Sequence, residues 1–437
     1  MSTVQIERRA DRRRHQLVTT WHDRRLQRTP IACWLPLVLV VAAEYKLRRR
    51  PPEDTLNGSL DLFILIELAA FAAVAAILLW RWRPRMRRHV VMIWIAGYCL
   101  TTAISSLYAP DPMLAMVRGF ELVVMLLAVI QFDLDGDLAM MRRFLHGLVV
   151  VTVVSIGIGV LYVAPVLPSQ AGRFTWLYTH SVTTGAMMAA STVVLFGMWL
   201  THPAARLPWR RWVYGALLVV TMTGLLFNRT RGSLGGAVLA MLVMSFLWAR
   251  TRGKRDLIVV GAVVVVGVGL TVFKPLLDYA LRGADAENLT SFNNRTMVWS
   301  IGGDIAIHRP LHGMGFTASR SVFLVDTGLG GAHNAYLNVM VDAGLIGMFW
   351  WLGIIGLIVA GVIKLRRRAR RFAEASPLTF DTITILGLMI CQLINAFTAE
   401  MLGAGVSLSA VLLFLSGVWL VQCEDQMDIV EREVVAA

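Results

Sequence analysis

The sequence predicts an all-α polytopic membrane protein with about twelve transmembrane helices. Of its 437 residues, 57% are hydrophobic and only 16% are charged, and the mean hydropathy is +0.63. Apolar runs of about 20 residues, the length that crosses a bilayer as a helix, recur along the chain. Since a helix satisfies its own backbone hydrogen bonds inside lipid, runs of this length favour membrane-spanning helices.

The apolar runs divide the chain into five regions. A basic tail (1–30) precedes nine spans (31–273), a long loop (274–344), three further spans (345–421) and a C-terminal tail (422–437). The first run is short for a span, and the turn between the seventh and eighth is tight. The predicted spans are 31–43, 62–80, 90–108, 113–132, 144–166, 182–201, 212–228, 233–249, 257–273, 345–363, 379–397 and 401–421.

The distribution of basic residues sets the orientation of these spans. With both tails in the cytoplasm, 29 of the 42 Lys and Arg residues lie on the cytoplasmic side and 12 lie outside, as the positive-inside rule requires. The long loop then lies on the side away from the cytoplasm. The exception is the outer cluster at 46–50, which indicates either that the first run does not cross or that the cluster holds anionic lipid. We prefer the interpretation that the first run crosses the membrane, because without this span every later loop would change sides and the basic loops would lie outside the cytoplasm.

Composition also excludes other classes of protein. The net charge of +14 does not indicate nucleic-acid binding, because the basic residues lie between apolar runs and no basic stretch is interleaved with aromatic residues. Three of the four cysteines fall in spans and the fourth in the C-terminal tail, so we expect no disulfide outside the cytoplasm and no cysteine metal site.

Cationic and imidazole side chains recur on the outer side of the predicted bundle. A single arginine at a membrane face more often contacts a lipid headgroup than a substrate. Several together match the oxygens of a diphosphate, because each guanidinium presents a fixed fork of donors. The predicted outer residues of this kind are Arg173, His180, Arg229, Arg231, Arg295 and His333.

His333 is the candidate base. It lies just ahead of the tenth span, where the start of a helix attracts anions, and a neutral imidazole there is able to accept a proton. The alternative is that it merely precedes a helix capped by Asn334. Asp342 is interpreted either as a carboxylate at the start of the span or as a partner for an outer arginine.

Three charged residues fall inside predicted spans, toward the outer ends of their helices. Glu67, Arg118 and Glu121 are interpreted either as partners of one another or as the lining of a cavity that opens outward. The outer loops carry no paired carboxylates of the kind that hold a metal with a diphosphate, so we predict no metal and no other cofactor.

Four ordered motifs, spread over about residues 110–365, resemble the O-antigen ligase and polymerase superfamily of membrane glycosyltransferases. Thr175 replaces the usual glycine after the first motif, and Asn294 stands where glycine is common in the third. The matching segments are Gly172–Phe174 with Thr179–Ser181, Asn228–Gly232, Asn294–Trp299 with Pro310–Gly315, and His333–Leu337 with Asp342–Gly347.

The resemblance implies a GT-C-type transferase in the bacterial inner membrane with its active site facing the periplasm. Such an enzyme, acting in lipopolysaccharide biosynthesis without a metal, takes a glycan from undecaprenyl diphosphate and passes it, with inversion, to an acceptor hydroxyl. In this reading His333 is the base. Arg173, Arg231 and Arg295 neutralise the diphosphate, with Asn334, His180, Arg229 and Asp342 in support.

The acceptor distinguishes the two closest functions. The leading reading is a ligase that joins O-antigen to lipid A-core, and the rival is an O-antigen or exopolysaccharide polymerase that uses the same donor. A flippase or exporter of anionic lipid is the alternative from another class, although the chain shows no internal repeat and no nucleotide-binding Gly-Lys motif. In all three readings the partners are membrane lipids and lipid-linked glycans, with no nucleic acid.

Overall fold

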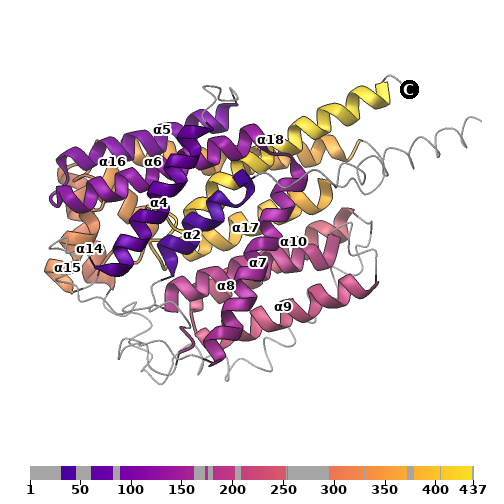
Figure 1. Ribbon diagram of the computed structural model, residues 1–437, viewed down its shortest axis with the longest axis horizontal. Helices are drawn as coiled ribbons and strands as arrows, with labels where there is room; N and C mark the ends of the chain where they lie inside the picture. Colours follow the sequence, from indigo (N-terminus) through magenta and orange to yellow (C-terminus); the bar gives the residue numbers. More distant parts are fainter. Residues whose placement is uncertain are drawn as a thin grey trace, which may run out of the picture.

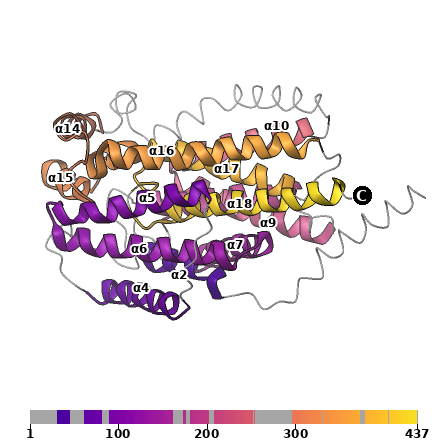
Figure 2. The ribbon, with the colours of Figure 1, turned by 90° about the horizontal axis from the view of Figure 1, so that it is seen from above.

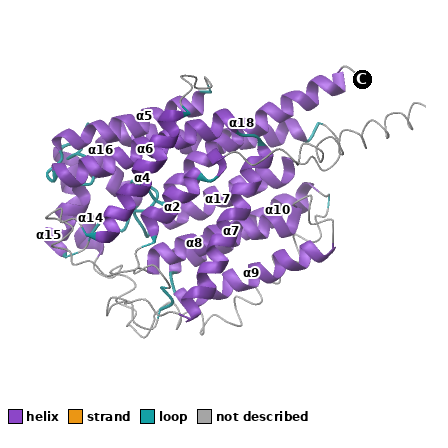
Figure 3. Ribbon diagram, viewed as in Figure 1, coloured by secondary structure: helices purple, strands orange, loops and turns teal. Residues whose placement is uncertain are grey.

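The computed structural model describes residues 31–45, 61–81, 89–161, 173–175, 181–201, 208–251, 253, 295–328, 330–371, 378–403 and 405–435. Within these ranges every regular element is a helix (Figure 3). Ten of the described helices are long and apolar enough to cross a membrane, which confirms an all-α polytopic membrane protein. The first predicted span forms a shorter apolar helix, Ile31–Glu44, and the ninth predicted span lies outside the described residues.

The long helices run along the long axis of the molecule (Figures 1 and 2). Two short helices, α14 and α15, lie at one end of this bundle, and the C-terminus of α18 extends from the other (Figure 1). The helices are α2 (Leu35–Glu44), α4 (Leu62–Trp80), α5 (Val90–Ser105), α6 (Pro112–Asp135), α7 (Leu138–Leu161), α8 (Ser181–Thr201), α9 (Pro208–Asn228), α10 (Arg231–Thr251), α14 (Arg295–His308), α15 (Ala318–Thr327), α16 (Ala335–Ala369), α17 (Leu378–Ala396) and α18 (Leu408–Val435).

Helices α8, α17 and α18 form the centre of the bundle, since most of their residues are buried. Helix α17 packs against α10 and α8, and it also contacts α16 and α18. By contrast, α4 is at the edge of the bundle (Figure 2) and leaves most of its apolar side chains unburied, as expected for a helix that faces lipid.

Charged residues inside the bundle are paired with one another. Arg118 Nη1 lies 2.9 Å from Glu67 Oε1 and 2.6 Å from Glu121 Oε2, which confirms the first of the two interpretations of this group. Toward the predicted cytoplasmic side, Arg142 donates from Nε and Nη2 to the two carboxylate oxygens of Asp381, at 3.1 and 2.5 Å. Such pairs hold helices in register, because an unpaired charge in the bilayer is costly.

A break in α16 anchors the predicted outer segment, from α14 to α15, to the bundle. Gly344 adopts φ +60° inside this helix and interrupts its hydrogen bonding. The chain between α14 and α15 forms backbone hydrogen bonds with α16 at this break. Leu345 N–H donates to Pro310 O at 2.7 Å, and Met314 N–H donates to Val341 O at 2.8 Å. The Pro310–Gly315 and Asp342–Gly347 segments therefore interlock, so that α14 and α15 are fixed over the outer end of the bundle.

The orientation of this segment can be tested by labelling Gly330→Cys. No atom lies within 4 Å of the position of a Cβ at Gly330, and the four native cysteines are buried. We expect a membrane-impermeant maleimide to modify this cysteine in intact spheroplasts, because the basic residues place the segment away from the cytoplasm. Labelling that requires opening of the inner membrane would overturn the predicted topology.

Candidate functional site

Arg173 lies in a short segment ahead of α8 and is bonded to the turn between α9 and α10. Its Nε donates to Asn228 O at 3.2 Å, and its Nη2 donates to Thr230 Oγ1 at 3.0 Å. The buried Asn228 side chain returns a hydrogen bond to Phe174 O at 2.7 Å. Two motifs that are far apart in the sequence thus interlock, and Arg173 is fixed beside the start of α10.

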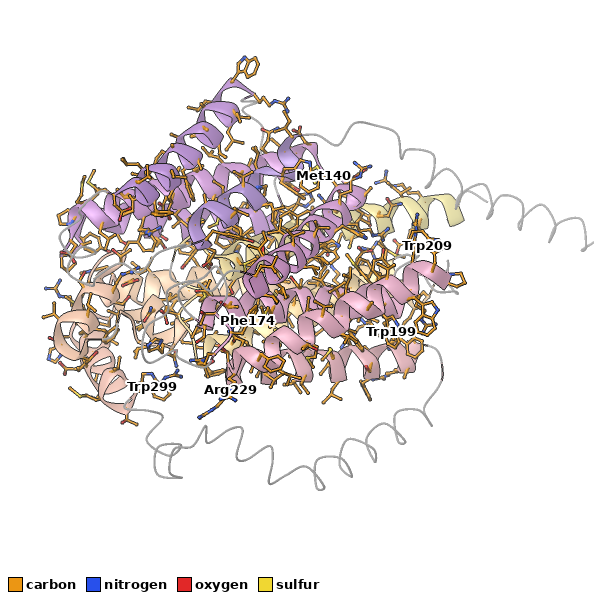
Figure 4. The ribbon with its side chains drawn as sticks, turned by 60° about the horizontal axis from the view of Figure 1, so that its bottom comes forward. Met140, Phe174, Trp199, Trp209, Arg229 and Trp299 are labelled. Carbon is orange, nitrogen blue, oxygen red and sulfur yellow. The ribbon has the colours of Figure 1, made fainter. Side chains whose placement is uncertain are left out.

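Arg229 lies in the same turn and Arg231 comes directly after it, and the two side chains have different surroundings. Arg229 has φ +55° and is exposed at the periphery of the bundle (Figure 4). Arg231 is the partly buried first residue of α10. The next residues contact the end of α17, where Ser233 Oγ donates to Asn395 Oδ1 at 3.2 Å. Arg231 is therefore the better placed of the two to act inside the site.

Arg295 begins α14 and is close to Arg231 and to Glu400, a residue of the segment between α17 and α18. Burial lowers the pKa of the Arg295 guanidinium, the negative charge of Glu400 opposes this effect, and the positive charge of Arg231 adds to it. Trp299, one turn further along α14, donates from Nε1 to Ala332 O at 3.0 Å. Helix α14 therefore brings a cation to the site and supports the chain directly ahead of His333.

His333 lies at the outer end of α16 with its backbone in the left-handed region, at φ +49°. Its Nδ1 is 3.3 Å from Glu400 Oε2, and its side chain is 19% exposed. Asn334 provides the helix cap, because its side chain accepts from Leu337 N–H at 3.1 Å. Asn334 thus caps the helix that follows His333, as the alternative interpretation expected, and the imidazole also lies beside the Glu400 carboxylate.

Glu400 was not predicted from the sequence. Gly331 leaves room for it, since a Cβ on that glycine would lie 3.3 Å from Glu400 Cδ. Its position in the sequence could have indicated a role. Glu400 is a carboxylate in the predicted outer turn between the last two spans, and most of the candidate residues on that side are basic. Its pairing with His333 joins segments far apart in the chain, and no local pattern reveals such a contact.

The remaining predicted residues lie elsewhere. Asp342 is buried and accepts from Ser319 N–H at 2.7 Å, so that it supports the start of α15, and it forms no ion pair with an arginine among the described residues. This hydrogen bond adds to the backbone hydrogen bonds that join the Pro310–Gly315 and Asp342–Gly347 segments. His180 lies outside the described residues.

Together, five segments contribute to one continuous group of charged side chains. Arg173 is bonded to the residue next to Arg231, Arg231 and Arg295 interact electrostatically, Arg295 interacts with Glu400, and Glu400 lies beside His333. The group contains three guanidinium groups and one carboxylate, so it carries an excess of positive charge. Its chemistry fits an anionic group with several oxygens, next to an imidazole that can move a proton.

Comparison with known proteins identifies the same part of the chain. The family model described as O-Antigen ligase matches residues 216–352. The matched range includes Arg231, Arg295 and His333, whereas Arg173 and Glu400 lie outside it. No curated protein matches the chain in sequence.

Proposed function

We propose, from the premise that the chain belongs to the O-antigen ligase and polymerase superfamily of membrane glycosyltransferases, that it is a ligase for lipid-linked O-antigen. In this proposal it transfers a glycan from undecaprenyl diphosphate to a hydroxyl of lipid A-core, at the periplasmic face of a bacterial inner membrane. The observation that carries the proposal is the convergence of Arg173, Arg231 and Arg295 with the His333–Glu400 pair.

His333 acts as the general base in this mechanism. In this mechanism the neutral ring carries its proton on Nδ1, the nitrogen that lies 3.3 Å from Glu400 Oε2, so that the other ring nitrogen, Nε2, is the proton acceptor. As the acceptor oxygen forms its bond to the anomeric carbon, its proton passes to Nε2 and the bond from that carbon to the diphosphate oxygen breaks. Attack opposite to the leaving group inverts the anomeric centre. Glu400 holds the ring and stabilises the imidazolium that forms.

The arginines stabilise the charge that develops on the leaving diphosphate. Guanidinium donors that are already in place cost little reorganisation during the reaction, and partial burial strengthens their interaction with the leaving group. The positive start of α10, where Arg231 is the first residue, adds to this effect. The same charges would otherwise be supplied by a divalent metal, so the proposed reaction requires none.

Arg231→Lys should reduce the transfer rate at least roughly tenfold although the charge is retained, because lysine cannot present a planar fork to two phosphate oxygens. The measurement is single-turnover transfer by the purified variant. Arg309→Lys is the matched control, since Arg309 is exposed in the same outer segment, and its rate should remain normal. A near-normal rate for Arg231→Lys would show that Arg231 acts through charge alone or only anchors the bundle.

The lipid-flippase alternative makes a different prediction for the same preparation. A flippase would move anionic lipid across a liposome membrane in the absence of any acceptor and would form no new glycosidic bond. The proposed transferase forms the bond, and it moves no lipid when the acceptor is left out.

A further inference from the structure

A shallow groove runs between the start of α2 and the cytoplasmic half of α7, on the lipid-facing surface of the bundle. Trp34 and Leu37 form one wall, and Val150 and Val151 form the deeper part of the other. Gly147 brings the walls together, because a Cβ at this position would lie 2.5 Å from Trp34 Cζ3. The groove is therefore built by close helix packing around one glycine.

The polarity of the groove changes along α7. This helix begins on the predicted cytoplasmic side, and at 1.5 Å per residue Arg143 lies roughly 8 Å and His146 roughly 12 Å from its start. Val150 and Val151 lie deeper, roughly 18 to 20 Å along the helix. Trp34 is 38% exposed, and an indole of this kind is typical of the membrane interface. A basic group at headgroup depth is thus followed by apolar side chains at acyl-chain depth.

The polar side chains of the groove are held in defined positions. His146 Nδ1 lies 2.6 Å from Arg142 O, and its Nε2 lies 3.1 Å from Tyr214 Oη on α9. Arg210 is close enough to His146 to interact with it electrostatically. Arg142 is paired with Asp381 inside the bundle, and its neighbour Arg143 lines the groove.

We propose that this groove binds one anionic phospholipid of the cytoplasmic leaflet. The phosphate lies against Arg143 within the field of Arg210, and an acyl chain follows Leu37 and the two valines into the membrane. The combination of positive charge at the interface with an apolar channel below it matches the charge and the polarity of such a lipid. The site is at the opposite end of α7 from the outer face, so it is separate from the proposed glycan donor and does not depend on the proposed transfer reaction.

Native mass spectrometry of the full-length protein tests this site with two lipids of identical acyl chains, phosphatidylglycerol and phosphatidylcholine. We expect one phosphatidylglycerol molecule to remain bound after removal of the detergent. Arg143→Gln should weaken its binding roughly fivefold, the usual effect of one basic residue near an anionic lipid. Arg250→Gln is the matched control, since Arg250 is an exposed arginine at the cytoplasmic end of α10, and binding should not change.

A second variant keeps the proposal testable if Arg143→Gln folds poorly. Val150 is 57% exposed, so Val150→Trp fills the deeper part of the groove without entering the protein core, and it should displace the lipid. Equal binding of phosphatidylcholine, retention of phosphatidylglycerol by a folded Val150→Trp protein, or equal weakening by Arg250→Gln would each overturn the proposal. So would cross-linking of a diazirine-bearing phosphatidylglycerol to peptides other than those of α2, α7 and α9.

Discussion

His333→Ala should reduce the rate of glycan transfer by roughly 100- to 10,000-fold, the usual contribution of a well-placed general base. An acceptor hydroxyl is a poor nucleophile near neutral pH, and in the proposed mechanism the imidazole is the group that takes the proton of this hydroxyl. The arginines are untouched, so donor binding should persist. The effect should therefore fall on turnover rather than on affinity for the lipid-linked donor.

Donor binding and single-turnover transfer should be measured on the same purified protein. His308→Ala is the matched control, because His308 is an exposed histidine at the end of α14 that pairs with Asp304. It should transfer at the normal rate. If His333→Ala lost thermal stability while its folded fraction turned over normally, His333 would be a structural residue. A well-folded His333→Ala protein with wild-type transfer would remove it from the mechanism.

Gly315→Ala should destabilise the protein by about 3 kcal/mol or more, because the added methyl group meets backbone atoms on a strained turn. Gly315 has φ +102°, and its Cβ would lie 2.6 Å from Ala109 Cα. Around this contact Tyr108 Oη donates to His312 O at 2.8 Å, and Ser321 donates to Asp111. These contacts hold the outer segment against the turn between α5 and α6, and the methyl group would push them apart.

Gly328→Ala is the matched control, because it introduces the strain of a positive φ without a steric clash. Gly328 has φ +72°, but no atom lies within 4 Å of the position of its Cβ. Gly328→Ala should therefore lower the free energy of unfolding by only about 1 kcal/mol. Thermal unfolding and limited proteolysis of the segment from α14 to α15 provide the measurement. Equal unfolding midpoints for the two variants would show that the contact with Ala109 does not hold the outer segment.

Most of the bundle could be predicted because a membrane span has a strong local signal. The sequence also predicted a tight turn between the seventh and eighth spans, which the structure places at 229–230. The cost of an unpaired charge in lipid made pairing one of two open interpretations for Arg118, and the contacts of the folded bundle decide between them. The start of α16 was predicted less accurately. The helix begins at Ala335, ten residues before the predicted span, because Asn334 caps a polar first segment and Gly344 then interrupts the helix.

The predicted C-terminal tail, 422–437, contains the end of α18, which continues to Val435. Its composition is polar, but Arg368 on α16 contacts two carboxylates of this segment. Arg368 Nη2 lies 2.7 Å from Asp428 Oδ1 and 2.7 Å from Glu431 Oε2. Pairing with a neighbouring helix extends α18 beyond the apolar span. A hydropathy pattern does not contain this information, because the contact joins distant parts of the chain.

The candidate site shows the same division between local and distant information. Arg231, Arg295 and His333 belong to short motifs that could be found in the sequence, although the roles assigned to them remain proposals. Glu400 and the hydrogen bond from Trp299 to Ala332 could not be found in this way, since both depend on how the helices pack. The sequence thus indicated candidate residues for the chemistry, and the fold adds the residues that contact His333 and the chain directly ahead of it.

The most direct test of the proposed function is mass analysis of the products formed by the purified protein. The donor is a glycan linked to undecaprenyl diphosphate, and the reaction is run in EDTA with and without lipid A-core. The proposal predicts a lipid A-core product enlarged by the mass of the glycan, formed at the same rate with or without chelation and absent without the acceptor. Longer lipid-linked glycans in the absence of lipid A-core would identify a polymerase instead. Loss of turnover in EDTA that magnesium or manganese restores would contradict the metal-independent mechanism, and absence of any new glycosidic bond would contradict the transferase.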